Sequence, residues 1–148
     1  MRAPAVKGEL VVRVRYCECD PMGVAHHAAY VAWLEMGRTE LLRVSGVSYA
    51  DLESAGVFLV VARLEVRYRA PGRYDDELMV ETALTGGGRA RLDHAYEVWR
   101  YERGGAGRAA LLATATSTLA CVDAEGRVRA LPGWLVWPGE GAATPRAT

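Results

Sequence analysis

The stretch HAAYVAWLEMGRTELLRV, residues 27–44, decides the fold. Its early half, AAYVAWLEMG, is apolar almost all the way round, which is typical of a helix buried on several sides rather than lying on a surface. Gly46 follows at a position suited to ending a helix. We therefore predict one long helix inside the protein, with core positions at Tyr30, Trp33, Leu34, Leu41 and Leu42.

Strand patterns surround this helix. Residues 9–16 alternate valine with arginine and predict a strand closed by Tyr16, which could be a plain core residue instead of part of a site. A short helical turn is expected over 49–55. Further strands are predicted at 57–69, 77–85, 90–102 and 109–122, with turns at Pro71–Gly72, Gly86–Gly88 and Gly104–Gly107. This order is an α+β arrangement, an antiparallel sheet curled around one helix.

Length and composition narrow the class of protein. The chain has 148 residues, which predicts a single domain over 1–137 followed by a small, polar tail, 138–148, expected to be disordered. Eighteen Lys and Arg balance 18 Asp and Glu, so the charge does not favour a nucleic-acid partner, and no apolar run approaches membrane-spanning length. Three cysteines without a disulfide framework favour the cytoplasm.

The loop before the helix, YCECDPMGVAHH (residues 16–27), gathers groups that could do chemistry. Asp20 stands before Pro21 and close to the helix start, where unpaired N–H groups and the helix dipole favour negative charge. An acid there, with the backbone N–H of His27 nearby, could polarise and attack a carbonyl group. Asp20 could equally be a simple helix cap, and His26 and His27 could be polar residues satisfied at a helix end.

Two other interpretations of this loop fit less well. Cys17, Cys19, Asp20 and His26 resemble a metal-ligand set, but zinc sites usually pair cysteines two to four residues apart. A cysteine–histidine nucleophile pair would need a thiol with a lowered pKa, which the sequence does not indicate. We therefore expect neither a metal ion nor another cofactor.

Three segments give the chain a family resemblance: VRVRYCECDPMGVAHHAAYVAWLEMGRTELLR (12–43), EVRYRAPGRYDDEL (65–78) and CVDAEGRVRALP (121–132). In these the sequence resembles the hot-dog-fold acyl-CoA thioesterases, with the 4-hydroxybenzoyl-CoA thioesterases and the Tol–Pal-associated acyl-CoA thioesterases as the nearest groups. The resemblance implies a five- or six-stranded antiparallel sheet wrapped around a long helix. It also implies a homodimer with active sites between subunits, often paired into a homotetramer.

The resemblance also implies roles for particular residues. Asp20 falls where these families place their essential carboxylate, and Tyr16 and His27 fall on positions that partner it. The segment that holds Gly23, Val24 and His26 would bind the thioester carbonyl, together with the His27 N–H. By default the basic residues of the later strands form a solvated face; with a CoA substrate, those expected to hold its phosphates are Arg63, Arg67, Arg89 and Arg91.

The expected activity is hydrolysis of an acyl-CoA thioester, with Asp20 acting either as nucleophile or as general base. The chain departs from both family groups at Glu18, Cys19 and His26, so the acyl group stays open. A hot-dog hydratase or dehydratase is an alternative function, and a non-catalytic acyl-thioester binding module is another.

Overall fold

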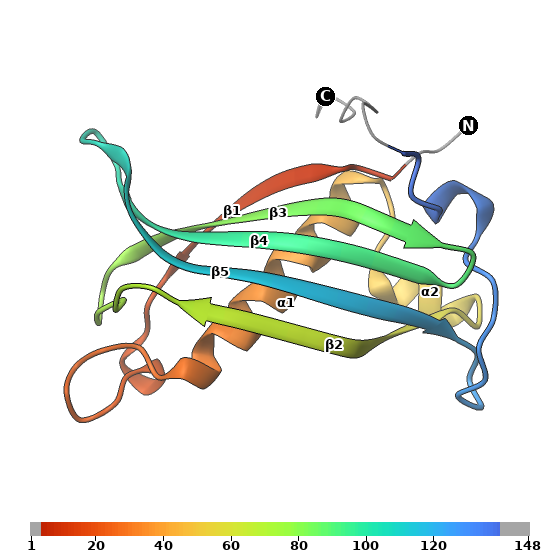
Figure 1. Ribbon diagram of the computed structural model, residues 1–148, viewed down its shortest axis with the longest axis horizontal. Coiled ribbons are helices and arrows are strands. Elements are labelled where there is room, and N and C mark those ends of the chain that lie inside the picture. The colour runs from red at the N-terminus through yellow and green to blue at the C-terminus, as the bar shows by residue number, and fades with distance from the viewer. Residues whose placement is uncertain (1–3, 140–148) are drawn as a thin grey trace.

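The computed structural model describes residues 4–139 of the chain, so most of the tail predicted to be disordered, 140–148, lies outside the described residues. One five-stranded sheet covers the long helix α1, His27–Val44, which runs diagonally behind it (Figure 1). A short helix α2, Tyr49–Ser54, and a 3₁₀ turn η2, Gly133–Leu135, lie at the end of the sheet where α1 stops. The strands are β1 Lys7–Arg13, β2 Phe58–Tyr68, β3 Glu77–Gly88, β4 Arg91–Glu102 and β5 Gly107–Val122.

The strands pair in the order β1-β3-β4-β5-β2, and every pairing is antiparallel. Side chains that face α1 alternate along each strand with side chains on the open face, as the two-residue period of a strand requires. On β3, for example, Leu78, Val80 and Leu84 are buried beneath the helix. The α+β hot-dog architecture expected from the sequence is therefore confirmed.

Helix α1 has the bounds that the sequence predicted, and all five predicted core residues are buried. Trp33 is 2% exposed and Leu34 is 1% exposed. The helix ends at Ser45, and Gly46 follows with a φ of 92°, a left-handed conformation that glycine adopts without strain. The expectation that this helix is buried on several sides was wrong: only the face toward the sheet is buried, and Val31, at 43%, and Met36, at 45%, are exposed on the other side.

The first strand is shorter than predicted at its C-terminal end. It stops at Arg13, and Tyr16 opens a 3₁₀ turn, η1, Tyr16–Glu18. The Tyr16 side chain is 81% exposed and meets the ring of Tyr74 edge-on at 5.6 Å between centroids. The alternative that Tyr16 is a plain core residue is not realised, because the chain leaves the sheet before this residue.

The predicted turn at Gly86–Gly88 was also wrong. Strand β3 continues through these glycines and the chain reverses at Arg89 and Ala90. The physical reason is close packing: a Cβ on Gly87 would lie 2.7 Å from the backbone oxygen of Arg91 and 3.2 Å from Cβ of Trp137. Gly87 thus lets Trp137, 50 residues further along the chain, pack against the hairpin.

Glycine also sets the distance between α1 and the sheet. A Cβ on Gly37 would overlap Oγ1 of Thr82 and lie 3.1 Å from a methyl group of Val80. Both contacts come from β3, an interior strand that lies between β1 and β4. The helix therefore rests on β3 at the one helical position that has no side chain.

We expect Gly37→Ala to lower the free energy of unfolding by about 1–3 kcal/mol, because the added methyl group overpacks a rigid contact. Chemical denaturation measures the change. Gly88→Ala is the control, since a Cβ there has nothing within 4 Å. Thr82→Ala should restore part of the stability when combined with Gly37→Ala; purely additive losses would contradict this contact.

Candidate active site

A tight turn holds the predicted acid. Residues Asp20 to Gly23 form it, and the Gly23 N–H donates to the Asp20 carbonyl at 2.9 Å. Aspartate in first position, proline in second and glycine in fourth are the residues that a type I turn favours. Gly23 has a φ of 76°, which a residue with a side chain would adopt only with strain.

The carboxylate of Asp20 is oriented by its own turn. Its Oδ1 accepts hydrogen bonds from the N–H groups of Met22, at 2.9 Å, and Val24, at 3.3 Å. Within residues 4–139, its Oδ2 has no hydrogen-bond partner. The side chain is half-buried, so one carboxylate oxygen is fixed and the other remains available to a substrate or a water molecule.

The start of α1 leaves one N–H group open. His26 is the N-cap: its Nδ1 accepts from the Ala28 N–H at 3.1 Å and its carbonyl from the Ala29 N–H at 2.9 Å. The His27 N–H has no partner among the described residues. The alternative that Asp20 caps the helix is not realised, because His26 does so. An open N–H at the positive end of an 18-residue helix suits a carbonyl oxygen.

A second loop, which the sequence analysis did not assign to the site, supports this arrangement. The Ala25 N–H donates to the Gly72 carbonyl at 2.7 Å, and the Tyr74 N–H to the Gly23 carbonyl at 3.3 Å. The Tyr68 hydroxyl donates to the His27 carbonyl at 2.8 Å. Burial raises the pKa of the Tyr68 hydroxyl, so it stays a donor near neutral pH. The segment RYRAPGRYDDEL carries these contacts, and its resemblance to the family was the available signal.

The other predicted groups belong to the same loop as Asp20. His26 and His27 are exposed, and their rings lie 4.1 Å apart between centroids. Partial burial, with the Asp20 and Glu18 charges as smaller causes, raises the pKa of the Cys19 thiol and so disfavours a thiolate nucleophile. In the described part of the chain, no three His, Cys, Asp or Glu side chains gather closely enough to hold a metal ion.

The predicted phosphate-binding arginines lie elsewhere on the molecule. Arg63 and Arg91 line one hollow of about 420 Å³, whose wall includes Thr116 and Thr118 but none of the loop residues around Asp20. In register, Arg63 lies opposite Thr118 on the sheet face away from α1. Arg67 lies further along β2, where it forms an ion pair with Glu65 at 3.4 Å. Arg89 is exposed at the β3–β4 turn.

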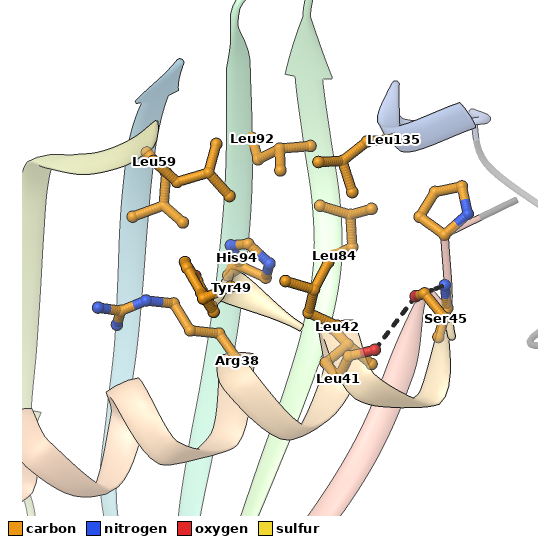
Figure 2. Close-up of a pocket in the computed structure, with 13 residues that line it drawn as sticks. Arg38, Leu41, Leu42, Ser45, Tyr49, Leu59, Leu84, Leu92, His94 and Leu135 are labelled. Carbon is orange, nitrogen blue, oxygen red and sulfur yellow. Dashed lines mark hydrogen bonds between the residues drawn. The ribbon is translucent and has the colours of Figure 1, made fainter. Parts of the chain in front are cut away.

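A separate cavity lies between the sheet and the C-terminal half of α1 (Figure 2). Its volume is about 20 Å³, room for about one water molecule, and leucines form much of its wall. Arg38 and His94 lie among these apolar side chains, where Arg38 Nε and His94 Nδ1 are buried without partners in the described chain. Arg38 is 11 residues beyond His27, about 16 Å along the helix, so this cavity is not part of the Asp20 site.

Comparison with known proteins identifies the family. Residues 14–142 match the model of the thioesterase-like superfamily. The chain is 33% identical over 114 residues to YneP of Bacillus subtilis, covering 77% of this chain and 78% of that protein. It is 34% identical over 113 residues to the acyl-CoA thioesterase YbgC of Haemophilus influenzae, covering 76% and 78%. A DHNA-CoA thioesterase from Staphylococcus aureus superposes with a TM-score of 0.75 and 29% identity, over 84% of this chain and 80% of that one.

The chain therefore belongs to the thioesterase-like superfamily, and the family expected from its sequence is confirmed. In the described residues, no helix is long and apolar enough to cross a membrane.

The buried imidazole of His94 should make stability depend on pH. Burial, assisted by the positive charge of Arg38, lowers the pKa of His94 from 6.5 to about 4. Between these two pKa values His94 binds a proton in the unfolded chain but stays neutral in the folded chain. The free energy of unfolding therefore falls as pH drops from about 6.5 to about 4. The loss amounts to about 3 kcal/mol.

Denaturant unfolding between pH 4 and pH 7 measures this loss. His94→Leu should reduce the slope of stability against pH. Leu92→Ala, a nearby core change that does not titrate, should lower stability at every pH and keep the slope. An unchanged slope in His94→Leu would contradict the assignment.

Proposed function

We propose that the protein hydrolyses an acyl-CoA thioester to a free acid and CoA, with Asp20 as the reacting carboxylate. The observation that carries this proposal is the pairing of an oriented carboxylate, whose Oδ2 is open, with the open His27 N–H in one short loop. Membership of the thioesterase-like superfamily supports the reaction class. The activities named for YbgC and the DHNA-CoA thioesterase support a CoA ester as substrate.

In this scheme the thioester carbonyl oxygen points at the first turn of α1. The His27 N–H donates to it, and the helix dipole stabilises the negative charge that develops there. Gly23 and Val24 line the approach, and His26 keeps the turn in place as the cap. Tyr16 and the His27 side chain, both exposed beside the loop, help to position the acyl group or the acid.

Two routes are open to Asp20. As nucleophile, its Oδ2 attacks the carbonyl carbon, the C–S bond breaks, CoA leaves as a thiolate that takes up a proton, and water hydrolyses the mixed anhydride. As general base, Asp20 takes a proton from water, the hydroxide adds to the carbonyl carbon, the C–S bond breaks, and the CoA thiolate takes up the proton from Asp20. A single turnover in ¹⁸O-water tests the nucleophilic route, because label incorporated into Asp20 requires the mixed anhydride.

The arginines that would hold the CoA phosphates are Arg63 and Arg91, which share one hollow, together with Arg67 and Arg89. Phosphates form strong charge-assisted hydrogen bonds with guanidinium groups. We place the enzyme in the cytoplasm, where its three free cysteines would stay reduced.

The site is proposed to work in a homodimer, or in a tetramer of two dimers. Strand β2 is an edge of the sheet, and it exposes Val60 at 44% and Val61 at 49%. A long apolar edge strand is a template for pairing with another chain. Arg63, Glu65 and Arg67 alternate in charge along it, so antiparallel pairing about a twofold axis through Leu64 sets Arg63 of one copy opposite Glu65 of the other.

We expect Asp20→Asn to lower kcat for CoA release by about 10²–10⁴-fold, with KM and the melting temperature little changed. The amide still accepts the loop hydrogen bonds but cannot attack or take a proton. A thiol reagent detects free CoA from short aliphatic, long aliphatic and aromatic acyl-CoAs.

Asp123→Asn is a matched control for that experiment. Oδ1 of Asp123 also accepts two backbone N–H groups in a tight turn, from Glu125 at 3.0 Å and Arg127 at 2.9 Å, away from the candidate site. Undiminished activity of Asp20→Asn would overturn the proposal. Absence of CoA release by the wild type would favour the hydratase or the binding module instead.

For the dimer, Glu65→Arg should weaken self-association about tenfold, because the two cross-strand pairs related by the twofold axis become repulsive. Adding Arg63→Glu recreates complementary pairs and should restore association. Sedimentation velocity measures the dissociation constant, and Glu125→Arg, an exposed change on a distant turn, is the control. A monomeric wild type would contradict this interface.

A further inference from the structure

Glu18 is a buried carboxylate in the loop that carries Asp20. Its side chain is 9% exposed, although it belongs to a 3₁₀ turn whose neighbours Tyr16 and Cys17 are exposed. Removing a carboxylate from water costs free energy unless several donors satisfy it. The contacts of Glu18 therefore need a specific explanation.

Hydrogen bonds to both carboxylate oxygens provide it. Oε1 accepts from the Arg15 N–H at 2.8 Å, and Oε2 accepts from the Trp33 indole N–H at 2.9 Å. The Glu18 carbonyl accepts from the His26 N–H at 2.7 Å. The Arg15 guanidinium adds an ion pair at 3.3 Å from its exposed position. One residue thus connects the start of the 3₁₀ turn, the buried interior of α1 and the N-cap of α1.

Trp33, the residue of α1 that holds the Glu18 carboxylate, is rigidly packed. Trp33 is 2% exposed and packs on Tyr30 with 4.8 Å between ring centroids. The indole therefore has little freedom to follow a moving loop. When its N–H holds Glu18, the loop takes its position from the core of the protein.

Both reactive groups of the proposed site lie next to residues that Glu18 fixes. Asp20 is two residues beyond Glu18, and the Asp20 N–H donates to the Val24 carbonyl at 2.9 Å. His27 follows directly after His26, whose N–H is held by the Glu18 carbonyl. The separation of the Asp20 carboxylate and the His27 N–H therefore depends on where Glu18 sits relative to Trp33.

We propose that Glu18 is a positioning residue for thioester hydrolysis: its carboxylate, clamped between the Arg15 N–H and the Trp33 indole, sets the distance between the Asp20 carboxylate and the open N–H at the start of α1. This inference rests on the proposed function of Asp20. It assigns Glu18 no contact with the reacting atoms.

Glu18→Gln tests the clamp with almost no change in shape. The amide offers one oxygen and one NH₂ group, so either the Arg15 N–H or the Trp33 N–H meets a donor instead of an acceptor. Because a misplacement of about 1 Å costs up to about 100-fold in rate, we expect kcat to fall 10- to 100-fold. KM should change less than about twofold, because the substrate-binding surface is retained.

Trp33→Phe supplies the second arm of a double-mutant cycle. It removes the indole donor, so Glu18→Gln should lower kcat much less in the Trp33→Phe background than in the wild type. Glu125→Gln is the matched control, an exposed glutamate on a distant turn, and should leave kcat unchanged. All rates are measured well below the melting temperature of each variant.

The outcomes separate this inference from the proposed function. A fall in kcat with KM retained, and coupling between Glu18 and Trp33, supports positioning. Wild-type kcat in Glu18→Gln, while Asp20→Asn is inactive, overturns positioning and leaves the role of Asp20 intact. Additive losses in the cycle, or a kcat that falls only in step with the fraction unfolded, also overturn it. Full activity in Asp20→Asn removes the proposed function and this inference together.

Discussion

The burial of α1 against the sheet is the constraint on which the rest of the structure depends. Trp33 and Leu34 are almost fully covered, and at Gly37 the helix approaches β3 so closely that no side chain fits between them. A helix fixed in this way has a fixed N-terminus, with N–H groups that the helix itself cannot satisfy. The loop between β1 and α1 must therefore reach that end and satisfy most of those groups.

Among the described residues, the loop satisfies all but one of these N–H groups. The exception, the N–H of His27, belongs to the proposed reactive site. His26 satisfies the N–H groups of Ala28 and Ala29, and the His26 N–H goes to Glu18. The His27 N–H remains, beside a carboxylate with one open oxygen. An unpaired donor costs free energy when it is buried, but His27 is exposed, so water can satisfy it until a substrate arrives. An enzyme that stabilises an oxyanion needs a preorganised hydrogen-bond donor of this kind, which no protein group occupies.

Some of this could be read from the sequence and some could not. The limits of α1 were predictable because a long apolar run followed by glycine is a strong local signal. Asp20 was predictable from the turn residues around it and from the family resemblance. The identity of the N-cap residue was not predictable, because rules for N-caps favour aspartate over histidine, and Asp20 lies six residues before His26.

The contact between Glu18 and Trp33 joins residues 15 apart and depends on how α1 is rotated, which only tertiary packing decides. The glycines at 86–88 misled for a similar reason, since Trp137, the close neighbour of Gly87, is distant in sequence.

The volumes of the hollows indicate where a single chain has room for its substrate. The cavity beside His94 has room for about one water molecule, and Arg38 and His94 bring unpaired polar atoms to it, so it is a poor place for an acyl group. The hollows large enough for part of a CoA ester open onto the surface: one of about 420 Å³ beside Arg63 and Arg91, another of about 380 Å³ between α1 and the start of β2. The second is lined by Val61, on the edge strand proposed to pair with another copy. Pairing along β2 would cover this hollow and exclude water from it. Its wall combines Glu35, Arg38, Thr39 and Glu53 with Leu59 and Val61, so this pairing would enclose a largely polar hollow that lies away from Asp20.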